Sequence, residues 1–223
     1  MPRISLFLIA LTASLGASAA TTYQYVGPTY SIVSGPYTTS QRVTGQFTTA
    51  STLAPNLPST NILAQVTSYS FSDGVHTYAS SDPNARVYSF VAGTDATGAI
   101  TNWALDFQVW TSGSSPHGAG DRYNEVRILG TGDYAMEGAT CSTTGTSVAG
   151  VADSCTVLNV SGLLTGQAYT PQAAGTWTKT APVVPVPTNS EGAAPALAVV
   201  LMVIAAATLR RRRTAAGARG GRR

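Results

Sequence analysis

One stretch of eleven residues, ITNWALDFQVW from Ile100 to Trp110, constrains the fold more than any other part of the sequence. Large apolar residues alternate along it with polar or small ones, which is the side-chain period of a β-strand and not of a helix. One face would carry Trp103, Leu105, Phe107 and Val109, and the other Asn102, Ala104, Asp106 and Gln108. The stretch therefore predicts a strand with one face in a core and the other in water.

Shorter segments of strand character lie on both sides of this stretch. They are residues 43–47, 66–71, 86–91, 123–129, 156–160 and 175–180. Asp73 and Gly74 form a turn pair after the second of them, which predicts a hairpin. The segment 86–91 is apolar on both faces, as expected of a central strand. Together these segments predict an all-β body over residues 20–180, built as an antiparallel β-sandwich or jelly roll.

The N-terminus has the pattern of a secretory signal peptide over residues 1–19. Arg3 gives a positive start, residues 4–15 are mostly apolar, and Ala17-Ser18-Ala19 offers small residues for cleavage by signal peptidase. The alternative is a buried first helix, but the stretch has no polar face and ends in small residues. We therefore expect the body to be exported.

The C-terminal region predicts a membrane span. Residues 193–209 carry no charge, and 17 residues of helix would span roughly 26 Å, at the short limit for a bilayer core of about 30 Å. A basic tail, 210–223, follows, and we expect it to stay in the cytoplasm. It opens with the topology-setting cluster Arg210, Arg211, Arg212 and Arg213. A Pro-rich spacer, 181–192, would extend between the body and the membrane.

A short motif within that spacer carries a resemblance to known sorting signals. Its residues are Val184, Pro185, Val186, Pro187, Thr188, Ser190 and Glu191. A Pro-containing signature, one hydrophobic helix and a terminal basic cluster resemble, in that order, the PEP-CTERM and IPTL-CTERM signals of exosortase-sorted bacterial proteins. The first class has a Val-Pro-Glu-Pro core. Here the chain reads Val184-Pro185-Val186-Pro187, with Val186 in the position of the glutamate. The second class has a core like Ile-Pro-Thr-Leu-Ser-Glu-Trp, and this chain departs from it at Asn189 and Gly192.

The resemblance implies a Gram-negative host and a membrane-embedded, exosortase-like transpeptidase that cuts near the signature. The protein would be anchored in the inner membrane by one span until that cut, and would then reach the cell surface or extracellular matrix. The opening of the body, YQYVGPTYSIVSGPYTT, together with YSFSDGVHTY, also resembles an uncharacterised domain that recurs in PEP-CTERM proteins. That domain implies no particular chemistry.

Charge narrows the choice of partners. The whole chain has a net charge of +3, but eight of its arginines lie in the two terminal segments. Residues 20–187 hold five basic and nine acidic side chains, a net charge of −4. A mildly acidic body lacks the basic patch that nucleic acid requires, so we expect no nucleic-acid partner.

The two cysteines, Cys141 and Cys155, predict a disulfide, because an exported domain meets an oxidising compartment. They enclose a polar loop, and a bridge over a loop of that length stabilises by about 3 kcal/mol in the chain-entropy model. Two free thiols or a metal pair are the alternatives. A metal site would require more ligands than two distant cysteines supply.

Candidate catalytic groups are few. Ser115, His117 and Asp121 share a Gly- and Ser-rich loop, but no nucleophile elbow accompanies them. The carboxylates Asp121, Glu125, Asp133 and Glu137 gather near one predicted hairpin, where a glycosidase would need two of them across a cleft. Glu125 shares a strand face with Arg127, which favours a solvated charged face. A calcium site is conceivable, although no loop has a calcium-binding pattern. We therefore predict no catalytic residue, metal or cofactor.

Trp110 is the candidate ligand contact. It has the opposite parity to Trp103 and ends its strand beside a loop, so it is either a surface aromatic on which a sugar stacks or a residue at the edge of the core. The leading hypothesis is a surface or matrix-associated protein without catalytic activity. The alternatives are a carbohydrate-binding module for the host's exopolysaccharide and, third, an extracellular hydrolase.

Overall fold

The computed structural model describes residues 20–159, 162 and 164–180. The chain divides into two compact units, Met1–Pro182 and Val183–Arg223, and all described residues belong to the first. The predicted signal peptide, the spacer with its sorting motif, the membrane span and the basic tail lie outside the described residues. Among the residues described, no helix has the length and apolar character needed to cross a membrane.

The described unit is all-β, as predicted, and its strands pair antiparallel in two sheets. The smaller sheet has the order β13-β1-β3-β5-β6, and the larger has the order β2-β12-β10-β9-β8-β7-β4, with β11 paired to β10. A short 3₁₀ helix, η1 (Leu63–Gln65), precedes β5. The strands are β1 (Thr21–Thr29), β2 (Ile32–Ser34), β3 (Arg42–Thr49), β4 (Thr60–Asn61), β5 (Val66–Ser72), β6 (Thr77–Ala79), β7 (Ala85–Thr94), β8 (Ile100–Trp110), β9 (Arg122–Leu129), β10 (Gly132–Gly145), β11 (Ser154–Leu158), β12 (Gly166–Tyr169) and β13 (Thr176–Thr180).

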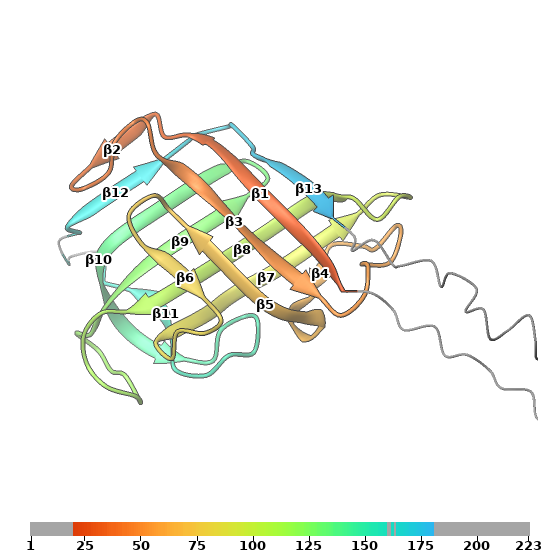
Figure 1. Ribbon diagram of the computed structural model, residues 1–223. Coiled ribbons are helices and arrows are strands. Elements are labelled where there is room, and N and C mark those ends of the chain that lie inside the picture. The colour runs from red at the N-terminus through yellow and green to blue at the C-terminus, as the bar shows by residue number, and fades with distance from the viewer. Residues whose placement is uncertain (1–19, 160–161, 163, 181–223) are drawn as a thin grey trace, which may run out of the picture. The chain divides into compact units, whose positions relative to one another are not determined.

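The two sheets pack face to face as a sandwich, and in Figure 1 the strands of the smaller sheet cross those of the larger one behind them. Aromatic side chains fill the space between. Phe107 of β8 stacks on Phe71 of β5 with ring centroids 4.9 Å apart, and Phe90 of β7 meets Phe107 edge to face. Such contacts add to the hydrophobic burial of large rings. The apolar side chains at alternate positions of β5, β7 and β8 thus produce this core.

The predicted hairpin turn after β5 is confirmed, and it is tied to the core by a buried carboxylate. Gly74 has φ +92°, a left-handed conformation that glycine adopts without strain. Asp73 accepts hydrogen bonds from the backbone N–H groups of Val75 and His76 at 2.8 and 2.6 Å. Its other oxygen accepts the hydroxyl groups of Tyr37 and Tyr78, each at 2.9 Å. A buried acid is thereby fully hydrogen-bonded, as burial requires.

The bounds of β8 match the predicted strand, but the expectation of a wet outer face holds only at Asn102 and is wrong at Asp106 and Gln108. Leu105 and Phe107 on the inner face are fully buried, yet Asp106 and Gln108 on the outer face are only 7% and 2% exposed. The segment around β11 folds back over this face: the side-chain amide of Gln108 exchanges two hydrogen bonds with the backbone of Cys155, at 3.0 and 2.9 Å. A second buried layer therefore lies outside the larger sheet.

The segment 86–91 is not a central strand. It belongs to β7, which is next to last in its sheet and pairs on its outer side only with the two residues of β4. Loops complete that edge, because Ile62 donates its N–H to the carbonyl of Phe90 and Ala149 donates to that of Tyr88.

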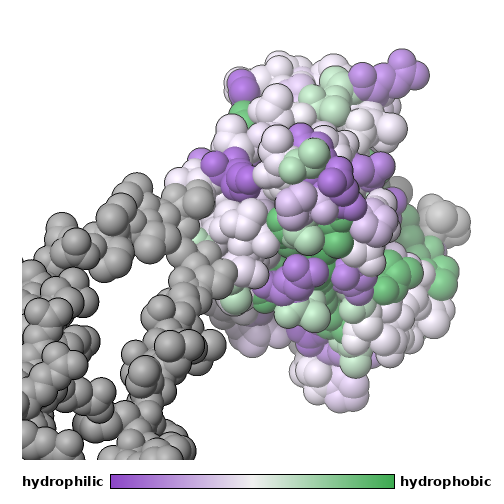
Figure 2. All heavy atoms as spheres, turned by 90° about the vertical axis from the view of Figure 1, so that its right-hand side faces the viewer, coloured by the Kyte–Doolittle hydropathy of each residue, from purple (hydrophilic) through white to green (hydrophobic). Residues whose placement is uncertain are grey.

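The first and last described strands are neighbours, with Thr22 of β1 opposite Thr180 of β13. Both described ends of the domain therefore lie on one side of the sandwich, to the right in Figure 1. Figure 2 looks at that side, where hydrophobic residues gather near the middle and hydrophilic ones surround them.

Candidate functional site

The predicted disulfide is confirmed and joins β10 to β11. The Cα atoms of Cys141 and Cys155 are 5.6 Å apart, and both residues are buried. They pack in a small hydrophobic cluster with Trp110, Tyr123 and Met136, all on the outer side of the larger sheet. The bridge thus holds β11 against the sheet and closes the second layer.

Trp110 lies inside this layer, so of its two predicted roles the structure fits the residue at the edge of a core and not the surface aromatic. It is 3% exposed, and its ring stacks on the imidazole of His117 with centroids 4.3 Å apart and planes 5° apart. The indole N–H donates to the carbonyl of Asp153 at 2.9 Å. His117, from the loop between β8 and β9, covers one face of the ring, and the 3% exposure leaves no open surface for a sugar to stack on.

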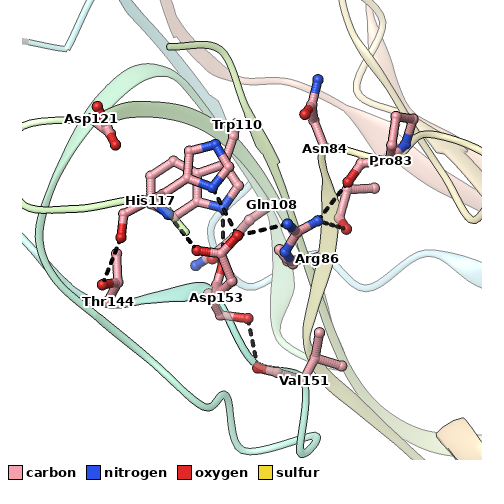
Figure 3. A network of polar contacts seen from close by, with 12 residues as sticks. Pro83, Asn84, Arg86, Gln108, Trp110, His117, Asp121, Thr144, Val151 and Asp153 are labelled. Carbon is pink, nitrogen blue, oxygen red and sulfur yellow. Dashed lines mark hydrogen bonds and ion pairs between the residues drawn. The ribbon is translucent and has the colours of Figure 1, made fainter. Parts of the chain in front are cut away.

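Asp153 organises a buried network around this ring, drawn in Figure 3. It accepts the backbone N–H of His117 at 2.7 Å, and its Oδ2 lies 2.9 Å from His117 Nδ1 and 2.8 Å from Arg86 Nη2. Burial raises the pKa of Asp153, but the hydrogen bonds from Arg86 and His117 outweigh it and hold the pKa below its usual range. The carboxylate is therefore ionised and fixes the covering loop to β7.

The candidate triad of Ser115, His117 and Asp121 is not assembled. The hydroxyl of Ser115 and the imidazole of His117 both bind Asp153, whereas Asp121 accepts the backbone N–H of Gly118 at 2.9 Å. Figure 3 shows the Asp121 carboxylate apart from the imidazole. The sequence did not point to Asp153, which follows His117 by 36 residues. The side chain of His117 is 2% exposed, so this dyad works as a packing element.

Glu125 and Asp106 form a buried acidic pair, so the expectation of a solvated charged face is wrong. Glu125 is 1% exposed and pairs with the guanidinium of Arg127, whose Nε also lies 3.2 Å from Asp106 Oδ2. Burial raises the pKa of both carboxyls; the negative charge of Glu125 adds to the shift at Asp106, and Arg127 opposes it at both. One cation thus serves two buried acids.

The other predicted carboxylates lie elsewhere. Asp133 points into the space between the sheets, where it accepts the hydroxyl of Tyr25 at 2.7 Å and burial raises its pKa to about 7. Glu137 is partly exposed and lies 3.5 Å from the imidazole of His76. The four carboxylates of the predicted hairpin therefore serve four different surroundings. Within the described ranges, no group of three or more acidic, histidine or cysteine side chains is placed to hold a metal ion.

The outer face of the smaller sheet is different, because hydroxyl and amide side chains cover it in rows. The strand register places these side chains opposite one another, and we call the three rows together the hydroxyl–amide face. The central row is Thr178, Gln24, Gln46, Ser70 and Ala79. One flanking row is Thr180, Thr22, Thr48 and Ser68. The other is Thr176, Val26, Thr44, Ser72 and Thr77.

Two open depressions hollow this face. One, of about 400 Å³, lies beside Thr44 and Thr77, and the other, of about 290 Å³, beside Thr48 and Ser80. Gln46 and Ser70 line both, so the two hollows lie on opposite sides of the central row. Sequence reasoning missed this face, although Thr, Ser and Gln at alternate positions of residues 44–48, 68–72 and 176–180 signalled it.

The fold and these sites define the described part of the chain as a two-layered, antiparallel β-sandwich with a disulfide-bonded outer cover. Comparison with protein-family models, with curated proteins and with solved structures finds no match to this chain.

Proposed function

We propose that this protein is exported from a Gram-negative cell and serves at the cell surface or in the extracellular matrix without catalysing a reaction. The observation that carries the proposal is the pairing of a signal-peptide pattern at residues 1–19 with the sorting-type motif, apolar segment and arginines of residues 184–213. The processing partners would be signal peptidase and an exosortase-like transpeptidase.

The disulfide supports export, because such bonds persist in oxidising compartments and are rare in the cytosol. The positions of the reactive side chains support a non-catalytic role. His117 and Asp153 bind one another, and the imidazole is 2% exposed. Glu125 is buried and paired with Arg127. A catalytic acid, base or nucleophile must reach its substrate, and these groups are occupied in internal contacts.

Mass spectrometry of the mature protein tests the proposal. The protein is recovered from the surface and medium fractions of its host, and both terminal peptides are identified. We expect an N-terminus after Ala19 or Ala20 and a C-terminus near the motif at residues 184–191. Recovery of an intact tail with Arg210 to Arg213 in the surface fraction would contradict the processing step. An uncleaved N-terminus in the cytosol would contradict export.

A carbohydrate-binding role is the second candidate. Trp110 does not support it, since the ring is buried. The hydroxyl–amide face supports it instead.

A further inference from the structure

We propose that the hydroxyl–amide face of the smaller sheet is a binding surface for a neutral polysaccharide. The face combines three features: exposed hydrogen-bonding side chains, three rows without a charged residue, and two shallow hollows that each extend across several strands. Nothing in this inference requires the proposed export route, because the face is a property of the folded domain alone.

Charge is the first argument. The five strands of the smaller sheet contain two charged residues, Arg42 and Lys179. Lys179 lies two residues after Trp177, which packs against the core, so Lys179 does not lie on the face that carries the outward threonines. Its ammonium group donates to the carbonyl of Thr97 at the end of the sheet. Arg42 is exposed on the same face as Thr44, two residues further along β3, and pairs with Thr29 at the edge of the third row. The three rows themselves hold no ionic group, which matches a ligand without charge.

Hydrogen-bonding capacity is the second argument. Gln24 and Gln46 stand opposite one another at the centre of the face, and both are exposed. Each amide offers two donors and one acceptor oxygen, and the threonine and serine hydroxyls around them both donate and accept. A polymer that carries hydroxyl groups on every unit presents the same two functions. The groups of the face and of such a ligand are therefore complementary without any charge.

The shape of the face is the third argument. Strands lie about 4.8 Å apart, so a row across five strands extends over about 19 Å. The two hollows lie on either side of Gln46 and Ser70, at the centre of that length. Individual hydrogen bonds contribute little net free energy, but a repeating polymer makes many of them at once, and linked contacts reinforce one another. The face thus fits an extended chain better than a small molecule, which would require an enclosed pocket.

A second copy of the chain fits this face less well. The fully buried centre of a stable protein interface is more apolar than the rest of the surface and is rich in aromatic, Met and Arg side chains. The rows hold two apolar residues, Val26 and Ala79, which stand in different rows. Val26 is 47% exposed and has no large apolar neighbour within its row. Protein association through this face would therefore lack the side chains that dominate affinity.

Affinity electrophoresis of the mature, full-length secreted protein tests the proposal. Native gels contain one of three neutral polymers, hydroxyethylcellulose, dextran or galactomannan, and a fourth gel contains carboxymethylcellulose. The cellulose derivatives share a backbone and differ in charge. We expect retardation by at least one neutral polymer, and weaker retardation by carboxymethylcellulose than by hydroxyethylcellulose.

The decisive variant is Gln24→Ala combined with Gln46→Ala, which removes both central amides from exposed positions. We expect the dissociation constant for the retarding polymer to rise about tenfold or more, since two hydrogen-bonding groups are lost. The matched control is Thr101→Ala combined with Asn102→Ala, two exposed residues of the other sheet; it should bind as the original protein does. Unchanged melting temperatures establish that each variant folds.

A further variant, Gln46→Lys, places one cation at the centre of the face. It should weaken binding to the neutral polymer and strengthen binding to carboxymethylcellulose. The proposal is overturned if no neutral polymer retards the protein, if the Gln24/Gln46 variant binds as tightly as the control, or if self-association through this face appears in sedimentation in place of polymer binding. None of these outcomes affects the export proposal, which rests on the terminal peptides.

Discussion

The two faces of β8 bury their side chains against very different surroundings. On the inner face, Phe107 stacks on Tyr69 and Phe71 of the smaller sheet, and Leu105 is fully buried in the same core cluster. On the outer face, Asp106 and Gln108 are nearly as buried. Gln108 hydrogen-bonds to the backbone of β11, which the disulfide joins to β10, and Asp106 forms an ion pair with Arg127. Apolar burial stabilises the inner face directly. The outer face is stable only while its polar groups keep their partners.

The largest effect is expected on the inner face. Phe107→Ala would remove a fully buried ring that stacks on Tyr69 and Phe71, at a cost of about 3–5 kcal/mol. Urea unfolding at pH 7 measures the change, and Thr101→Ala, at an exposed position of the same strand, is the control. A loss below about 1 kcal/mol would show that the inner face is not a close-packed core.

The next largest effect on stability is expected from Asp133, a buried acid between the two sheets. Burial raises the pKa of Asp133 from 3.8 to about 7, so the folded state binds a proton between these values that the unfolded state releases. The contribution of Asp133 to stability therefore falls as pH rises from about 4 to about 7, by up to about 4 kcal/mol. Asp133→Asn should remove this fall and make the protein more stable than the original above pH 7. Urea unfolding from pH 4 to pH 8 measures it; parallel curves for the two proteins would contradict the assignment.

On the outer face, loss of the disulfide should have an effect of about 3 kcal/mol, the value for a loop of this length. Cys141→Ser combined with Cys155→Ser should lower the free energy of unfolding, measured in urea, by that amount and increase hydrogen exchange in β11 more than in β8. Reduction of the original protein should reproduce the result. Equal exchange in the two strands would mean that the cover does not depend on the bridge.

The smallest effect, about 2 kcal/mol, is expected for Arg127→Met. The change leaves Asp106 and Glu125 without their cation, and full burial would cost more, but the Arg127 side chain is 43% exposed. The loss should be larger at pH 8 than at pH 4, because both carboxyls have raised pKa values and take up protons in acid. Arg127→Lys, which keeps the charge, is the control. An equal loss at both pH values would assign the effect to packing alone.

These two faces also mark what the sequence could predict. Alternation located β8 with its bounds, and the turn residues Asp73 and Gly74 located the hairpin after β5. It could not show that the outward side chains are buried, because the cover comes from residues 146–158, far along the chain. One signal was present: Trp110, Met136 and Cys141 all belong to the outer cluster, and large apolar residues at outward positions indicate a second layer.

The candidate sites follow the same division. The pairing of Cys141 with Cys155 was predictable from composition and compartment. The Asp153–His117 contact joins residues 36 apart through a loop without regular structure, so no periodicity could reveal it. The hydroxyl–amide face was legible along each strand, but its rows depend on strand order and register, which a single sequence does not specify.

The pairing of the first strand with the last has a mechanical consequence. β13 is an edge strand joined to β1 by five residue pairs, from Thr22–Thr180 to Val26–Thr176. Suppose that a polymer holds the sheet while tension acts on the chain beyond Thr180. A pull along the strand axis then loads all five pairs together. A pull that separates the two ends of the domain opens them one after another, starting at Thr180. The direction of tension would thus decide whether the five pairs of β1 and β13 resist the load together or separate one pair at a time.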